Sequence, residues 1–230
     1  MKQKILIKYA SRSRPYKFFE GLDNILEMIS DKENYCILIS LDVDDLTMYN
    51  QNVFTKFKNY LQQYGDHLVI KYGTSQSKID AINRDVNEIK ERYDFDILIN
   101  FSDDMKFTKH GFDEIIRKKF KSHFPDTDGN LHFNDGFTKD ALSTMSIIGR
   151  KYYDRYNYIY HPSYKSLWCD NEYTTLAKRQ NKIVYFDEVI FLHNHPSNVG
   201  GLIDEQLIKT ESYSEEDRLN YEERLKNNFQ

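Results

Sequence analysis

The stretch of sequence that decides the fold is residues 96–105, Asp-Ile-Leu-Ile-Asn-Phe-Ser-Asp-Asp-Met. The apolar run that ends at Phe101 predicts a buried strand, and the pair Asp103 and Asp104 follows the end of that strand. In an open α/β sheet, ligands bind at this carboxyl edge. Two neighbouring carboxylates repel each other, and a cation that prefers oxygen ligands, such as Mg²⁺ or Mn²⁺, relieves the repulsion. The stretch therefore predicts a metal site that holds a phosphate.

The residues on either side of this stretch alternate between strand-like and helical patterns. Apolar runs occupy residues 4–9, 35–41, 67–71 and 95–101, and a segment with helical spacing of apolar residues follows each run. This alternation predicts a mostly parallel α/β sheet with helices on both faces. One of the segments, through Ile79, Ile82, Val86, Ile89 and Tyr93, predicts a single continuous helix.

The alternation stops after residue 120, and short strand-like pieces then mix with loops. Residues after about Ser212 predict a charged helix, which Ser214 opens with Asp217 as its capping-box partner. The chain has 230 residues, of which 40% are hydrophobic, and it lacks internal repeats and linkers rich in Gly or Ser. A single domain is therefore expected.

The net charge and the cysteine content restrict the functions and the cellular compartments that the sequence allows. The net charge of -4 argues against tight nonspecific binding to a nucleic acid backbone. Cys36 and Cys169 are too few for a disulfide framework, and Cys36 lies within an apolar run, which favours a reducing compartment. The amino terminus shows no secretory segment, and no stretch has the length of a transmembrane helix. We therefore expect a soluble cytoplasmic protein.

Acidic clusters follow two of the predicted strands, Asp42-Val-Asp-Asp45 after the second and Asp103-Asp104 after the fourth. The ends of parallel strands meet at one edge of a sheet, so these carboxylates should converge. Successive strand residues face opposite ways. We therefore expect one of Asp103 and Asp104 to bind the metal directly, and the other to bind a sugar hydroxyl or the metal through water. The alternative is that such acids make turns or cap helices, as Asp45 could.

Two further groups of residues could carry chemistry. Asp170 and Glu172 precede a predicted helix, where an acid can be a cap, a first-turn charge or a general base. Residues two apart on a helix diverge, so only one of them can enter a cleft, and we place Asp170 first. His193 and His195 share one face if the strand before them continues, and neutral imidazole binds Mn²⁺. Zinc is disfavoured because no Cys/His cluster accompanies them.

Several common motifs are missing from the sequence. It has no Gly-x-x-x-x-Gly-Lys-Ser/Thr phosphate loop, no Gly-x-Gly-x-x-Gly after the first strand and no Gly-x-Ser-x-Gly nucleophile elbow. These absences argue against kinases, dehydrogenases and hydrolases of the usual types.

Taken in order along the chain, the motifs resemble those of the GT-A glycosyltransferases, especially the family 2 type. The segment 9–15, Tyr-Ala-Ser-Arg-Ser-Arg-Pro, resembles the nucleotide-side loop, and Asp42 resembles the aspartate that contacts the base. The segment 73–83 resembles the Gly and Ala-x-Asn helix element. Phe101-Ser-Asp-Asp-Met105 resembles the metal motif, with Ser102 in place of the first acid of a strict Asp-x-Asp. Trp168-Cys-Asp-Asn-Glu172 resembles the Glu-Asp stretch of the catalytic base, with Cys169 in place of the glutamate.

The resemblance implies a GT-A fold in one domain, with a nucleotide-sugar-binding half (1–120), an acceptor-side half (121–200) and a C-terminal helical extension (201–230). It implies a nucleotide-diphosphate sugar as donor and Mn²⁺ or Mg²⁺ bound by Asp104, His193 and His195. Asp170 falls on the base position of an inverting transfer to an acceptor hydroxyl, with Glu172 as the second candidate. The residues implied for the donor are Tyr9, Ser11, Arg14, Asp42, Lys78, Asn83, Ser102 and Asp103.

Two other functions compete with this interpretation. A nucleotidyltransferase of related topology would show a glycine-rich basic loop after the first strand, whereas residues 9–15 are basic but contain no glycine. A non-catalytic sugar-nucleotide-binding protein would not need the acids and histidines together. The sequence allows four classes of acceptor: a glycan, a protein, a small molecule and a modified DNA base. The excess of acidic residues disfavours DNA.

Overall fold

The computed structural model describes residues 2–200 and 204–230. Across these residues the central sheet has seven strands in the order β3-β2-β1-β4-β7-β6-β8, and β5 and β9 form a separate pair. The strands are β1 (Ile5–Ala10), β2 (Tyr35–Asp42), β3 (Leu68–Gly73), β4 (Ile97–Phe101), β5 (Met105–Phe107), β6 (Asn130–Phe133), β7 (Ile147–Gly149), β8 (Ile183–Phe186) and β9 (Phe191–His193). Strands β1 to β4 run parallel, and β7 runs antiparallel to both β4 and β6. The predicted α/β class and mostly parallel sheet are confirmed.

Helices cover both faces of the sheet because successive strand side chains alternate between the faces. Ile5, Ile7 and Tyr9 of β1 pack into one core with α1 (Pro15–Met28), α2 (Gln51–Tyr64) and α5 (Phe112–His123). Leu6 of the same strand packs into a second core on the other face. That core takes its helical residues from α3 (Lys78–Asn83), α4 (Val86–Ile89), α6 (Arg150–Tyr153) and α7 (Cys169–Arg179). A short 3-10 turn, η1 (Gly65–His67), leads into β3.

The prediction of one continuous helix through residues 79–93 is wrong, because the segment breaks into α3 and α4. At the break, Asp85 has a left-handed backbone with φ of 72°. The carbonyl of Arg84 turns toward the sheet and accepts a 2.9 Å hydrogen bond from Nζ of Lys8, which is fully buried. An unpaired buried ammonium is costly, so satisfying Lys8 outweighs the helical hydrogen bonds lost at this point.

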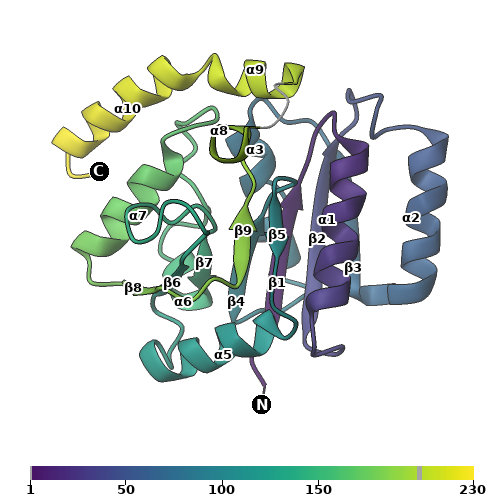
Figure 1. Cartoon of the computed structure of the whole chain (residues 1–230), viewed down its shortest axis with the longest axis horizontal. Helices are drawn as coiled ribbons and strands as arrows, with labels where there is room; N and C mark the ends of the chain where they lie inside the picture. The colour runs from purple at the N-terminus through teal and green to yellow at the C-terminus, as the bar shows by residue number, and fades with distance from the viewer. Residues whose placement is uncertain (1, 201–203) are drawn as a thin grey trace.

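Three helices complete the chain: α8 (Pro196–Val199), α9 (Glu205–Glu211) and α10 (Ser214–Lys226). Figure 1 shows α9 and α10 as a band along the edge of the molecule where α3 and α8 lie, away from the N-terminus. Helix α10 begins at Ser214 as predicted, but Asp217 bonds to another segment and does not cap its own helix. No helix among the described residues has the length and apolar character needed to cross a membrane.

Candidate active site

A cavity of about 170 Å³ opens at the carboxyl edge of β1, β2 and β4. The loops after these three strands form its floor, α3 forms one wall and α9 forms another. The residues that line it are Ala10, Ser11, Arg12, Arg14, Asp42, Asp44, Ser75, Gln76, Ser77, Lys78, Ala81, Ile82, Asn100, Phe101, Ser102, Asp103, Asp104, Lys165, Ser166, His195, Gln206, Leu207, Lys209, Thr210 and Tyr213. The position agrees with the general rule for ligands in open α/β sheets.

The two neighbouring aspartates occupy different environments within this cavity. Asp103 accepts hydrogen bonds from Oγ of Ser11 at 2.6 Å and from Nη1 of Arg14 at 3.1 Å. Burial nevertheless raises the pKa of Asp103. Burial also acts to raise the pKa of Asp104, but the hydrogen bond and charge of His193 outweigh it and leave that pKa well below its usual range. Asp104 is therefore the more firmly ionised carboxylate of the pair.

Histidine side chains approach Asp104 because β9 pairs with β5. This pairing places His193 opposite Met105, and Nε2 of His193 lies 3.5 Å from Oδ2 of Asp104. The backbone N–H of Asn194 donates to the carbonyl of Asp104 at 2.7 Å. His195 lines the cavity, and its ring centroid lies 5.7 Å from that of His193. The carboxylate and imidazole groups gathered here are ligands that Mn²⁺ accepts.

Asp170 lies in the first turn of α7, directly after Trp168 and Cys169. Burial raises the pKa of Asp170, whereas Lys78 and His193 act to lower it. Asp170 does not line the cavity, but it lies within electrostatic range of Lys78, which does, and of His193, which contacts Asp104. A carboxyl whose pKa is perturbed close to a cavity is a candidate general base.

Arginines of the β1 loop pair with acids at the rim of the cavity. Arg12 donates to Asp42 at 3.1 Å and forms a bidentate pair with Asp44 at 2.7 and 2.9 Å. Arg14 joins Asp103 to Asp204 at the start of α9, with contacts of 2.6 and 2.8 Å to Asp204. The sequence motifs did not assign Arg12 or the α9 residues to the site. For Arg12, the basic character of residues 9–15 is the one feature of the sequence that indicates such a role.

Five predicted site residues do not line the cavity: His193 and Asp170, which interact with residues that do, and Tyr9, Asn83 and Glu172, whose side chains bond elsewhere. Tyr9 is fully buried on the α1 face of β1, where its hydroxyl donates to the carbonyl of Phe18 at 3.1 Å. Asn83 holds another loop, since its Nδ2 donates to the carbonyl of Tyr160 at 2.7 Å. The carboxylate of Glu172 faces away from the cavity toward α10 and is bound by side chains there. We therefore remove these three residues from the candidate site.

Most of the other predicted residues lie together in the cavity at the carboxyl edge of the sheet. Those that line the cavity are Ser11, Arg14, Asp42, Lys78, Ser102, Asp103, Asp104 and His195. Of the two remaining residues, His193 contacts Asp104 at 3.5 Å, and Asp170 lies within electrostatic range of Lys78 and His193.

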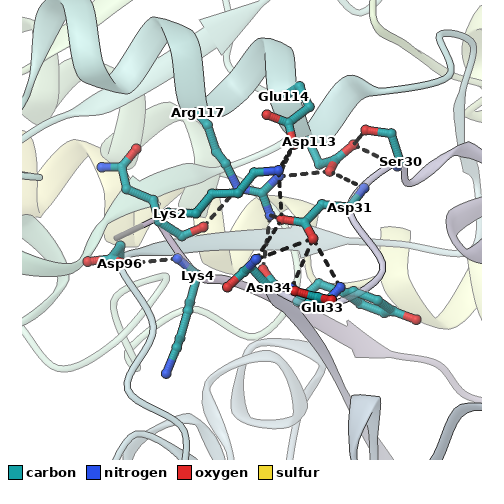
Figure 2. A network of polar contacts seen from close by, with 12 residues as sticks. Lys2, Lys4, Ser30, Asp31, Glu33, Asn34, Asp96, Asp113, Glu114 and Arg117 are labelled. Atoms are coloured by element: carbon teal, nitrogen blue, oxygen red, sulfur yellow. Dashed lines mark hydrogen bonds and ion pairs between the residues drawn. The ribbon is translucent and has the colours of Figure 1, made fainter.

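A separate acidic cluster of Asp31, Asp113 and Glu114 also has ligand atoms within 4.8 Å of one another. It lies where β2 begins, at the opposite edge of the sheet from the cavity, and Figure 2 shows cationic side chains entering it. Arg117 contacts Asp113 at 2.8 Å, Glu114 at 3.0 Å and Asp31 at 3.3 Å, and Lys2 contacts Asp31 at 3.1 Å. These contacts neutralise the acids without a metal ion, so we interpret the cluster as an ion-pair network.

The parallel half-sheet and the antiparallel strands beyond β4 have the arrangement of the GT-A fold. Comparisons with protein-family models and with curated proteins find no match, whereas solved structures match over most of the chain. One is a mannosyltransferase, PcManGT from Pyrobaculum calidifontis in complex with GDP-Man and Mn²⁺, at a TM-score of 0.63 and 10% identity over 86% of this chain and 59% of that one. Another is S. aureus TarS 1–349, at a TM-score of 0.62 and 12% identity over 85% of this chain and 61% of that one.

The same TarS fragment in complex with UDP-GlcNAc matches at a TM-score of 0.61 and 12% identity, over 94% of this chain and 67% of that one. The chain thus spans about three fifths of the length of the first two structures. At these identities the likeness establishes the fold.

Proposed function

We propose that the protein is a metal-dependent glycosyltransferase that moves a sugar from a nucleotide-diphosphate donor to an acceptor hydroxyl with inversion. The observation that carries the proposal is the cavity at the sheet edge, where Asp104 lies 3.5 Å from His193 and Lys78 lies within electrostatic range of Asp170. The GT-A fold supports it, because solved proteins of this fold were captured with GDP-Man and Mn²⁺ or with UDP-GlcNAc.

In this proposal Asp104, His193 and His195 hold Mn²⁺ or Mg²⁺. The donor set fits such an ion, because it combines a hard carboxylate oxygen with imidazole nitrogens. When bound, the cation supplies positive charge that stabilises the departing diphosphate. The thermal-shift test below, repeated with each metal, distinguishes Mn²⁺ from Mg²⁺.

The remaining cavity residues orient the donor. Asp103, fixed by Ser11 and Arg14, is placed to accept a hydrogen bond from a ribose or sugar hydroxyl. In this proposal Asp42, which lines the cavity, contacts the nucleobase, and Ser102, which lies beside Asp104, contacts the donor. The cationic Lys78 lies close to the proposed phosphate position, where it would offset negative charge.

Asp170 acts as the general base. Its carboxylate takes the proton from the acceptor hydroxyl while the acceptor oxygen forms a bond to the anomeric carbon and the bond to the diphosphate breaks. A single displacement of this kind inverts the anomeric configuration. The acceptor class stays open, and the cytoplasmic location stays a prediction from the two cysteines.

The test is a thermal-shift panel of UDP, GDP, CMP and dTDP sugars, each with and without Mn²⁺. A donor at 100 times its Kd adds about 2.7 kcal/mol of stability, which corresponds to a Tm increase of about 5–10 °C for a domain of this size. We expect this increase for at least one sugar nucleotide, and only with metal. The proposal fails if no donor gives a metal-dependent shift.

Two variants separate the assigned roles. Asp104→Asn should abolish the metal-dependent shift, whereas Asp170→Asn should retain it and lose donor turnover, measured as sugar transfer or donor hydrolysis. Asp94→Asn is the matched control, because the Asp94 side chain is 91% exposed and lies away from the cavity. An Asp170→Asn protein with wild-type turnover would exclude Asp170 as the base.

A further inference from the structure

Helix α10 presents one polar face to the segment that carries Asp170. Asp217, Tyr221 and Arg224 follow one another at spacings of four and three residues, so they share a face of the helix. Arg224 binds Glu172 of α7 through Nε at 2.6 Å and Nη2 at 2.8 Å. The Tyr221 ring packs on Trp168, with ring centroids 5.5 Å apart. These two contacts bracket the first turn of α7, which contains Asp170.

Asp217 makes the most specific of these contacts. It is 1% exposed, and its carboxylate accepts hydrogen bonds from the backbone N–H groups of three consecutive residues, each at 2.8 Å. These residues, 165–167, form the loop that leads into α7, which begins at Cys169, one residue before Asp170. A carboxylate that accepts several backbone N–H bonds in a buried position fixes the conformation of the loop that donates them.

The loop that Asp217 holds also belongs to the cavity. Lys165 and Ser166 line the cavity wall, and the carbonyl of Lys165 accepts a hydrogen bond from the backbone of Ile79 at 3.3 Å. Ile79 directly follows Lys78 in α3. One carboxylate outside the cavity therefore organises the junction between the helix that bears Lys78 and the helix that bears Asp170.

We propose that Asp217 is a positioning residue for the transfer reaction, and that it acts by holding loop 165–167 so that Asp170 reaches the acceptor hydroxyl. The inference rests on the proposed glycosyltransferase function. It assigns a catalytic purpose to the C-terminal extension, which sequence motifs leave without a role. Displacing a catalytic group by about 1 Å can cost about 100-fold in rate, whereas the proposed nucleotide contacts come mainly from loops after β1, β2 and β4.

The test uses Asp217→Asn in the full chain, which keeps the shape of the side chain but leaves a single oxygen to accept three N–H bonds. We expect donor turnover to fall at least tenfold, while the Kd of the donor with Mn²⁺ changes less than threefold. Hydrogen exchange at residues 165–167 should accelerate. Asp217→Glu, which restores the carboxylate, should recover part of the turnover.

Arg218→Gln is the matched control on the same helix. Arg218 pairs with Glu215 and Glu222 of its own helix, so this variant should match the wild type in turnover, donor Kd and exchange at the loop. Wild-type turnover in Asp217→Asn would overturn the positioning role. Equal losses of donor affinity and turnover would also overturn it, because they would indicate a general structural defect.

Different results refute the glycosyltransferase function and the positioning role of Asp217. A wild type that binds and turns over no sugar nucleotide refutes the glycosyltransferase function, and the positioning role with it. An active wild type with an unaffected Asp217→Asn variant refutes the positioning role alone.

Discussion

Replacing Arg117 by glutamine tests whether the acidic cluster of Figure 2 is an ion-pair network or a metal site. The Arg117 side chain is 6% exposed and contacts three carboxylates, two of them almost fully buried. Its Nε and Nη2 also donate to the carbonyls of Gln3 and Asn34, at 2.8 and 2.9 Å. Arg117→Gln therefore leaves Asp31 and Asp113 buried with less compensating charge.

The expected cost follows from these contacts. Removing one partner of a buried ion pair costs about 3–5 kcal/mol, and a domain of this size loses about 2–4 °C in Tm per kcal/mol. We therefore expect a Tm decrease of about 6–20 °C, with a parallel loss in the free energy of unfolding measured by urea denaturation. In Arg117→Gln, Asp113 keeps its hydrogen bonds from Ser30 and from the backbone of Asp31. These bonds still stabilise its charge, so we expect the loss of stability not to exceed this range.

A matched control and a metal titration complete the experiment. Arg92→Gln removes an exposed pair with Glu88, at 3.7 Å, and should change the free energy of unfolding by less than about 0.5 kcal/mol. In an Asp104→Asn background, which lacks the proposed cavity metal, stability should be insensitive to the removal of divalent ions by EDTA. A loss below about 1 kcal/mol in Arg117→Gln, or strong destabilisation of the Asp104→Asn protein by EDTA, would refute the ion-pair interpretation.

Two further predictions concern pH. Because burial raises the pKa of Asp170, its ionised form destabilises the folded state, so Asp170→Asn should raise the Tm at pH 7. That gain should shrink on acidification and vanish below the ordinary aspartate pKa of about 3.9, where the carboxyl is protonated in both states; a Tm difference that is independent of pH would contradict it. Burial lowers the pKa of Lys8 to about 7, so the unfolded chain binds more protons and stability should rise from about pH 7 to 10.5, by at most about 5 kcal/mol. Lys8→Met should flatten this rise in urea denaturation measured at several pH values, and an unchanged rise would show that other groups cause it.

The sequence was sufficient to predict the parallel strands β1 to β4 because each of them contains an apolar run. Strands β1, β2 and β4 are buried on both faces, so their runs stand out from the amphipathic helices between them. The same pattern located Asp103 and Asp104 at a strand end. The position of the acidic pair at the cavity therefore followed from the sheet itself.

Other features depend on contacts that leave no periodic pattern. The break between α3 and α4 arises from Lys8, about 75 residues earlier in the chain. Tyr9 was assigned to the site by its place in a motif, but strand alternation directs it into the α1 core. The polar face of α10 has no apolar stripe to reveal it, so its contacts with loop 165–167 became evident from the structure alone.

The pairing of the cavity arginines affects how salt would act on ligand binding. Arg12 and Arg14 are already bound to carboxylates, and the partners Asp44 and Asp204 are 63% and 37% exposed. A phosphate that binds either arginine must displace a carboxylate, so binding exchanges one anion for another. Such an exchange releases few counterions, and added salt weakens the competing ion pairs as well. Donor affinity would then vary little with ionic strength, unlike that of a pocket lined by unpaired basic residues.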